Sequence, residues 1–109
     1  MNISESPKPP YFAVIFTSVR AESDNDDGYD DMAIRMWDLA HEQPGFLGVE
    51  SARQDVGITV SYWQDLKSIS EWRANFDHQG AQKLGRERWY RSYRVRVCEV
   101  LRDYGLDAS

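Results

Sequence analysis

The chain has 109 residues, 41% of them hydrophobic and 28% charged, and a formal net charge of −5. This length suits one domain, the negative charge argues against non-specific binding to nucleic acid or acidic membranes, and the single cysteine excludes an intramolecular disulfide. No apolar run approaches the roughly 18 residues of a membrane span, and residues 1–10 lack the apolar core of a signal peptide. We therefore expect a cytoplasmic protein with no nucleic-acid or membrane partner.

The first apolar segment is Tyr11–Ser18, which is rich in β-branched and aromatic residues. Such a run predicts a strand that is buried on both faces. Residues 1–10 before it are polar and contain three prolines, so we expect a disordered N-terminal tail.

An acidic segment, residues 22–31, leads into the first predicted helix, for which Asp26 or Asp27 is the expected N-cap. Pro44 and Gly45 end this helix. Its apolar residues recur at helical spacing on one face: Tyr29, Met32, Ala33, Met36, Leu39 and Ala40.

A predicted hairpin follows, with strands at Phe46–Arg53 and Ile58–Trp63 and a tight turn at Gln54–Gly57. Side chains alternate along a strand, so Glu50 points to the sheet face opposite that of Val49 and Ser51. There it either pairs with Arg94 or Arg96 of a partner subunit or remains a solvated charge.

The second helix is predicted from the spacing of Leu66, Ile69, Trp72, Arg73 and Phe76. Its start is ambiguous, because Asp65 can cap it and Ser68 with Glu71 also fits a capping box.

Two glycines, Gly80 and Gly85, favour a separate short helical piece at Ala81–Arg88. Alternation predicts a last strand over Tyr93–Cys98. The end of the chain, Asp103–Ser109, is expected to fray, so the domain covers residues 11–104 and a C-terminal tail covers 105–109.

The predicted order β-α-β-β-α-β is that of an α+β, ferredoxin-like fold with a four-stranded antiparallel sheet. Right-handed crossovers place both helices on one face of this sheet. The other face carries apolar side chains, so we expect a second copy of the chain to cover it and to form a homodimer.

Several segments resemble one known family, namely Gly45–Glu50, Ile58–Trp63 with the following Ser70-Glu71-Trp72, and Arg94–Val97. Over residues 11–104 the chain resembles the antibiotic biosynthesis monooxygenase superfamily of dimeric α/β barrels. That family includes cofactor-free oxygenases of aromatic polyketides or quinols, haem-degrading enzymes, and members without known activity.

The resemblance implies roles only where residues match. Trp72 falls where haem-degrading members have a Trp on the second helix. The family's iron-binding His would fall at Gln82, whereas His78 lies closer to Trp72, and the strand Tyr11–Ser18 contains no Asn. We therefore expect no cofactor, with haem disfavoured. No metal site is expected, since the sequence lacks zinc spacings and calcium-loop carboxylates.

The candidate catalytic residues are Trp72, Asn75 and His78. Trp72 can stack on a flat ligand or simply belong to the core. Asn75 lies three positions later on the same helix face and can bind a carbonyl or peroxide, or remain solvated. His78 can act as a base or iron ligand, or be an exposed loop residue.

The candidate ligand-binding residues are Arg86, Trp63, Phe76 and Tyr90. Arg86 suits an anionic or enolate oxygen, or a salt bridge that fixes its loop. The three aromatic candidates either line a pocket or pack in the core, namely Trp63, Phe76 and Tyr90. The predicted function is a cofactor-independent monooxygenase acting on an aromatic or quinol-like molecule. The alternative is a non-catalytic dimer that binds a small hydrophobic molecule or haem.

Overall fold

The computed structural model describes residues 3–21, 28–78, 80–84 and 88–106, and excludes the side chains of residues 77, 78, 81 and 82. The predicted element order is confirmed. The elements are β1 (Tyr11–Arg20), α1 (Tyr29–His41), β2 (Phe46–Arg53), β3 (Gly57–Trp63), α2 (Leu66–His78), the short α3 (Ala81–Leu84) and β4 (Tyr90–Val100).

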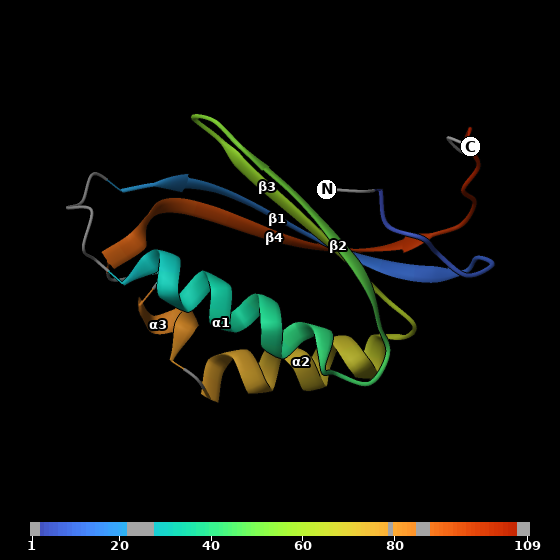
Figure 1. Ribbon diagram of the computed structural model, residues 1–109, viewed down its shortest axis with the longest axis horizontal. Coiled ribbons are helices and arrows are strands. Elements are labelled where there is room, and N and C mark those ends of the chain that lie inside the picture. Colours follow the sequence, from blue (N-terminus) through green and yellow to red (C-terminus); the bar gives the residue numbers. More distant parts are fainter. Residues whose placement is uncertain (1–2, 22–27, 79, 85–87, 107–109) are drawn as a thin grey trace.

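The four strands form one antiparallel sheet in the order β2-β3-β1-β4, as a ferredoxin-like fold requires. Phe16 on the central strand β1 pairs with Thr59 on one side and with Val95 on the other. Figure 1 shows α1 and α2 side by side on one face of this sheet. The sheet and the helices therefore make two layers, and aromatic side chains lie between them.

Strand β4 is longer than predicted because its pairing with β1 runs from Tyr11↔Val100 to Arg20↔Tyr90. The partner strand lies far away in the sequence, so local alternation alone does not give these ends.

The ends of two helices also differ from the prediction. The N-cap of α1 is Gly28, with φ 79 and no side-chain cap, rather than Asp26 or Asp27, which lie outside the described residues. Helix α3 covers Ala81–Leu84 of the predicted piece Ala81–Arg88, and residues 85–87 of that piece lie outside the described residues.

A register shift in β2 changes which of its residues face the helices. Phe46 pairs with Trp63, whereas Gly48 pairs with Tyr62, so Leu47 is the extra residue of a β-bulge. Trp63 and Tyr62 point to opposite faces, and the bulge therefore turns Phe46 toward the helices.

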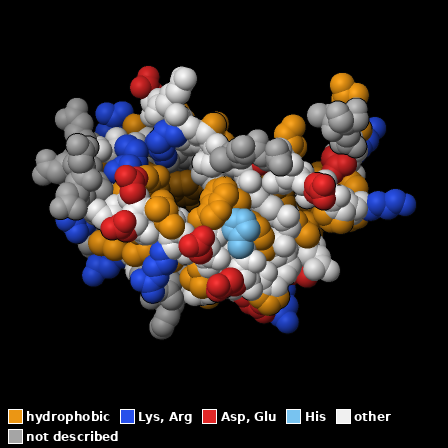
Figure 2. All heavy atoms as spheres, in the orientation of Figure 1, with side chains coloured by type: hydrophobic (Ala, Val, Ile, Leu, Met, Phe, Trp, Pro, Cys, Tyr) orange, Lys and Arg blue, Asp and Glu red, His pale blue; other side chains and the backbone are white. Residues whose placement is uncertain are grey.

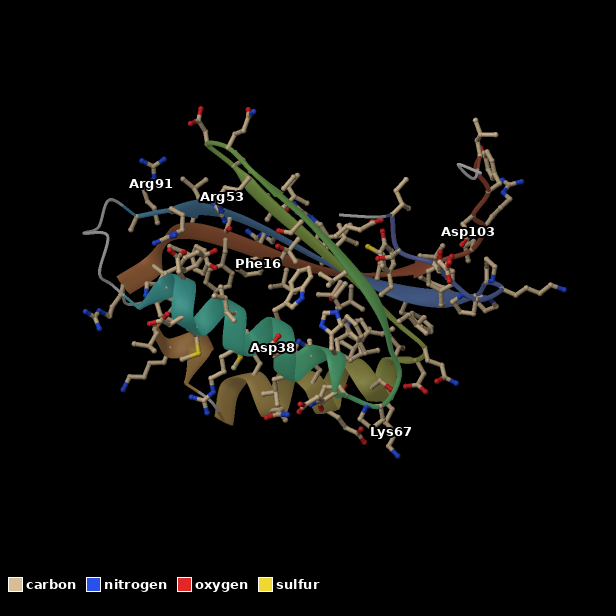
Figure 3. The ribbon with its side chains drawn as sticks, viewed as in Figure 1. Phe16, Asp38, Arg53, Lys67, Arg91 and Asp103 are labelled. Atoms are coloured by element: carbon tan, nitrogen blue, oxygen red, sulfur yellow. The ribbon has the colours of Figure 1, made fainter. Side chains whose placement is uncertain are left out.

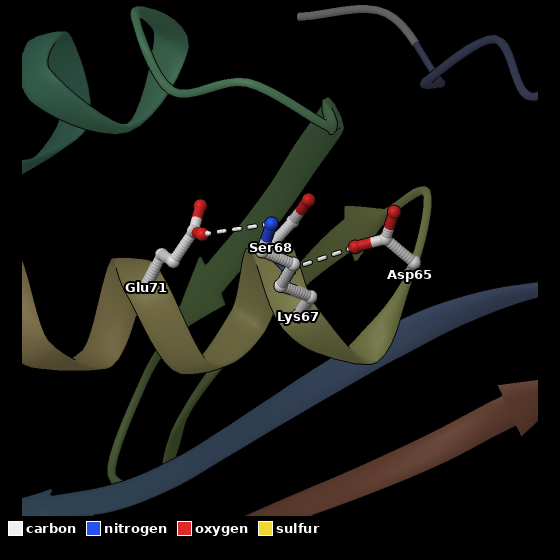
Figure 4. Close-up of polar contacts among 4 residues, drawn as sticks. All are labelled: Asp65, Lys67, Ser68 and Glu71. Carbon is white, nitrogen blue, oxygen red and sulfur yellow. Dashed lines mark hydrogen bonds and ion pairs between the residues drawn. The ribbon is translucent and has the colours of Figure 1, made fainter.

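The start of α2 is set by Asp65, whose Oδ1 accepts a hydrogen bond from the Ser68 backbone N–H at 2.8 Å (Figure 4). This resolves the ambiguity in favour of Asp65 over the Ser68 capping box. One turn later, Lys67 and Glu71 form an exposed ion pair at 3.8 Å.

The described part of the N-terminal segment contacts strand β2 and the segment after β4, although the sequence suggested a disordered tail. The Ser4 N–H donates to Glu50 Oε2 at 3.0 Å, and its hydroxyl donates to the Val49 carbonyl at 3.3 Å. Ser6 Oγ donates to Asp103 Oδ2 at 2.7 Å. A Cβ on Gly48 would lie 2.7 Å from Ser4 Oγ, so the glycine permits this close approach.

Few large hydrophobic side chains are fully covered. Trp63 at the centre is 0% exposed. The buried hydrophobic residues are Tyr11, Ala13, Met36, Trp63, Ile69 and Trp89. The core of one subunit is therefore small and aromatic.

Candidate functional site

The first of two aromatic groups lies between β2, β3 and α2. Trp63 stacks on Trp72 with ring centroids 6.0 Å apart and an interplanar angle of 26°. Phe46 meets Trp63 at 5.4 Å and Phe76 meets Trp72 at 5.9 Å, both in T-shaped contacts. Three predicted residues, Trp63, Trp72 and Phe76, are therefore brought together. Trp63 is wholly buried, whereas Trp72 and Phe76 are partly exposed.

The second aromatic group lies where β1 and β4 approach the start of α1. The Phe16 ring contacts Tyr90 at 5.3 Å and Tyr93 at 5.5 Å, and Tyr29 contacts Tyr90 at 5.8 Å. The guanidinium of Arg20 lies 3.5 Å from the centre of the Tyr29 ring, a cation–π contact. Tyr90 is the predicted site residue in this group.

Tyr90 is held in its neutral form. Burial raises the pKa of Tyr90 far above its ordinary value, and its hydrogen bond to the Tyr29 hydroxyl at 3.3 Å acts in the same direction. The charges of Arg53 and Arg20 oppose this shift without cancelling it. At neutral pH the phenol can therefore donate a hydrogen bond but cannot serve as a base.

A hollow lined by hydrophobic side chains opens between α1 and the sheet (Figure 2). In the same orientation, Figure 3 labels Phe16 and Arg53 on the sheet side of this hollow and Asp38 on α1. A separate cavity of about 290 Å³ lies beside the start of α1, and its lining residues are Gly28, Asp31, Met32, Arg35, Leu84, Arg88 and Trp89.

The structure describes the other predicted site residues only in part. Asn75 is half-buried on α2, and within the described residues its side chain has no hydrogen-bond partner. The backbone of His78 ends α2, but its side chain lies outside the described part, as does Arg86.

Sequence reasoning missed Phe16 and Arg53. Phe16 resembles any apolar strand residue, and Arg53 ends a strand where a solvated charge is expected. Arg53 reaches Ser18 on β1, 35 residues away, and the sequence contains no signal for that contact.

The other histidine, His41, packs on Phe46 with ring centroids 4.7 Å apart, and its Nδ1 lies 2.7 Å from the Trp37 carbonyl. Strand β1 contains no Asn. Among the described residues, no three His, Cys, Asp or Glu side chains gather where they could hold a metal ion.

Within the described part of the chain, no helix is both long and apolar enough to cross a membrane.

No family model matches the chain. The chain is 54% identical over 100 residues to the uncharacterised protein YqjZ of Bacillus subtilis, an alignment that covers 90% of this chain and 86% of that protein. It is 32% identical over 97 residues to the jasmonate monooxygenase ABM of Pyricularia oryzae. That match covers 86% of this chain but only 39% of the longer fungal protein.

The fold also matches solved structures. SnoaB, a cofactor-independent oxygenase from Streptomyces nogalater, superposes with a TM-score of 0.71 over 87% of this chain and 97% of its own, at 10% identity. This similarity shows the shared ferredoxin-like fold. Together with the relatives in sequence, it shows that the chain belongs to the antibiotic biosynthesis monooxygenase (ABM) superfamily.

Proposed function

We propose that the protein is a cofactor-independent monooxygenase that acts on an aromatic or quinol-like small molecule. The observation that carries this proposal is the apolar hollow between α1 and the sheet, with Phe16 beside it, in a chain of the ABM superfamily. A flat substrate can pack against aromatic rings there, and the surrounding side chains exclude water.

The chemistry needs a substrate that gives an electron to oxygen itself. A deprotonated quinol or phenol reduces O₂ by one electron, and the resulting radicals combine to form a carbon-bound hydroperoxide. Loss of water leaves one oxygen atom on the ring as a carbonyl, and the other departs in the water. The protein supplies orientation and a dry cavity. The neutral Tyr90 hydroxyl donates its proton to Tyr29 and is suited to accept a hydrogen bond from a hydroxyl of the substrate.

The relatives support oxygen chemistry without agreeing on a substrate. SnoaB is a cofactor-independent oxygenase, and the fungal relative is a jasmonate monooxygenase. The choice of an aromatic or quinol substrate rests on the rings that surround the hollow.

The homodimer is part of the same proposal. Ile58 is 46% exposed on the sheet face opposite the helices, whereas Val95 and Val97, at 49% and 51%, lie on the edge strand β4 on the helix side. A second copy on the face opposite the helices would cover Ile58.

Oxygen uptake with anthrone-type phenols, naphthoquinols and jasmonate tests the function. We expect uptake above the rate of spontaneous oxidation, unchanged after treatment with a metal chelator and reduced in Phe16→Ala. Saturable binding without uptake would instead favour the non-catalytic binding dimer. A Soret band on haem titration that is lost in His78→Ala would favour haem binding.

A further inference from the structure

Arg53 is an arginine held in place on the sheet without a carboxylate. Its Nη2 donates to Ser18 Oγ, and its Nη1 lies 3.5 Å from the Ser18 carbonyl. Ser18 is 1% exposed, so the guanidinium is fixed to a buried point of β1. Among the described residues, no Asp or Glu forms an ion pair with it.

The backbone leaves room for this guanidinium. A Cβ on Gly57 would overlap Cζ, Nη2 and Nε of Arg53, so only glycine lets the side chain lie across β3 at this point. Gly57 pairs with Ser18 in the sheet, and both face the side on which the helices lie.

The charge of Arg53 reaches the hollow. It is one of two arginines that act electrostatically on Tyr90, whose ring packs on Phe16. Figure 3 labels Arg53 and Phe16 on the same side of the hollow seen in Figure 2. An aromatic surface and an unneutralised guanidinium therefore lie together at one opening.

We propose that Arg53 binds an anionic oxygen of the substrate, a carboxylate or a deprotonated ring hydroxyl, while the substrate ring packs against Phe16. Two of its N–H groups hold Ser18, and the remaining ones form a planar donor edge that suits such an anion. The assignment rests on the proposed function, because it names the charge of the molecule that enters the same hollow.

Two probes of equal shape test the assignment by binding alone. Quenching of tryptophan fluorescence measures the affinity for 2-naphthoate, an anion, and for 2-naphthamide, which is neutral. Charge-assisted hydrogen bonds of this kind predict a preference for the anion of about tenfold or more. Arg53→Gln should remove this preference, and Arg53→Lys should restore part of it, because Lys keeps the charge but not the planar fork.

Arg73→Gln is the matched control, since it removes the same charge from an exposed position on α2. It should keep the preference of the wild type. Equal affinity of the wild type for both probes overturns the proposal, and this comparison does not depend on how well any variant folds. A preference that survives Arg53→Gln, or that Arg73→Gln also abolishes, overturns it as well.

The result of this binding test can be told apart from the result of the oxygen-uptake test of the proposed function. Arg53-dependent binding of naphthoate without oxygen uptake by any substrate would reject the monooxygenase and keep the anion site. Oxygen uptake by a protein that does not prefer the anion would reject the anion site and keep the monooxygenase.

Discussion

Two tyrosines on the sheet face opposite the helices each donate a hydrogen bond to a carboxylate. Tyr62 bonds Glu50 at 2.5 Å, and Tyr11 bonds Asp103 at 2.5 Å. The two rings meet at 6.1 Å in a T-shaped contact. Glu50 is therefore engaged by Tyr62 and Ser4 of its own chain and is not a free solvated charge. Its pairing with Arg94 or Arg96 of a partner subunit stays a prediction.

Tyr62 makes stability depend on pH in the alkaline range. Burial, with the hydrogen bond to Glu50, raises the pKa of Tyr62 to about 12 from an ordinary value of 10.0. Because the pKa is higher in the folded state, the stabilisation is complete below about pH 10 and is lost as the pH rises toward 12. Melting temperatures across this range should fall less steeply in Tyr62→Phe than in the wild type. Tyr104→Phe, which removes a phenol that is 91% exposed, should retain the wild-type slope.

The two stacked tryptophans should differ in their contribution to stability. Trp63→Ala removes a side chain that is 0% exposed and is expected to lower the free energy of unfolding by about 3–5 kcal/mol. Trp72→Ala should cost less, since Trp72 is partly exposed. Urea denaturation measures both changes, and equal losses would contradict the difference in burial. Trp72→Phe should preserve folding while weakening a ligand that stacks on this ring.

The sequence predicted part of the site at the residue level. Helical spacing identified Trp72 and Phe76, and alternation identified Trp63, because each lies on an element with a regular period. Arg53 could not be identified, since its role depends on Ser18 and Gly57, which reach it only through strand pairing.

At the level of the elements, the start of α2 depends on one side chain. The hydrogen bond from the Ser68 backbone N–H is the first cause that lowers the pKa of Asp65. Asp65→Ala should therefore lower the melting temperature, while Asp65→Asn should lower it less, because Asn also caps helices. With a folded-state pKa below the ordinary 3.8, the contribution is present above that pH and is lost in stronger acid.

Glu71→Ala is the control for this cap. It removes the acceptor that the alternative capping box would use and leaves Asp65 in place. A larger drop in melting temperature for Glu71→Ala than for Asp65→Ala would show that the helix start was assigned to the wrong residue.

The elements themselves were largely predictable, and their ends were not. The bounds Phe46–Arg53 were predicted correctly because Gly45 and a turn flank this strand. The prediction was too short for β4 and missed the bulge at Leu47. Both features arise from the register between strands, which depends on the folded sheet rather than on local pattern.

At the level of the whole molecule, one subunit is unusually exposed. Its accessible surface is 8204 Å², whereas a folded monomer of 12.7 kDa exposes about 6,200 Å². The exposed residues 101–106 contribute to this excess, and so do the uncovered apolar side chains of the sheet.

We therefore expect the protein to sediment as a dimer at micromolar concentration. Ile58→Lys should weaken this dimer, because it places a charge on an apolar side chain of β3 that is 46% exposed on the face opposite the helices. Ile34→Lys makes the same change at a site on α1 that is 62% exposed and should leave the dimer intact. A wild-type protein that sediments as a monomer would contradict the homodimer.

The N-terminal segment is expected to add to stability, given the contacts of Ser4 and Ser6. A chain that begins at Pro10 loses both contacts and leaves Tyr11 alone to bond Asp103. Its melting temperature should be lower than that of the full chain. An unchanged value would restore the expectation from the sequence that residues 1–10 form a disordered tail.

Ser4 has a further consequence for how copies of the sheet can join. An open sheet ends in two strands whose unpaired backbone groups can recruit another chain. These are β2 and β4, and Ser4 already occupies the outward carbonyl of Val49 on β2. Edge-to-edge pairing of β2 with β4 of a neighbouring copy can repeat without limit, unless two copies face each other and close the contact at two. By holding the Val49 carbonyl, Ser4 removes one of the backbone acceptors through which an open-ended fibre would grow.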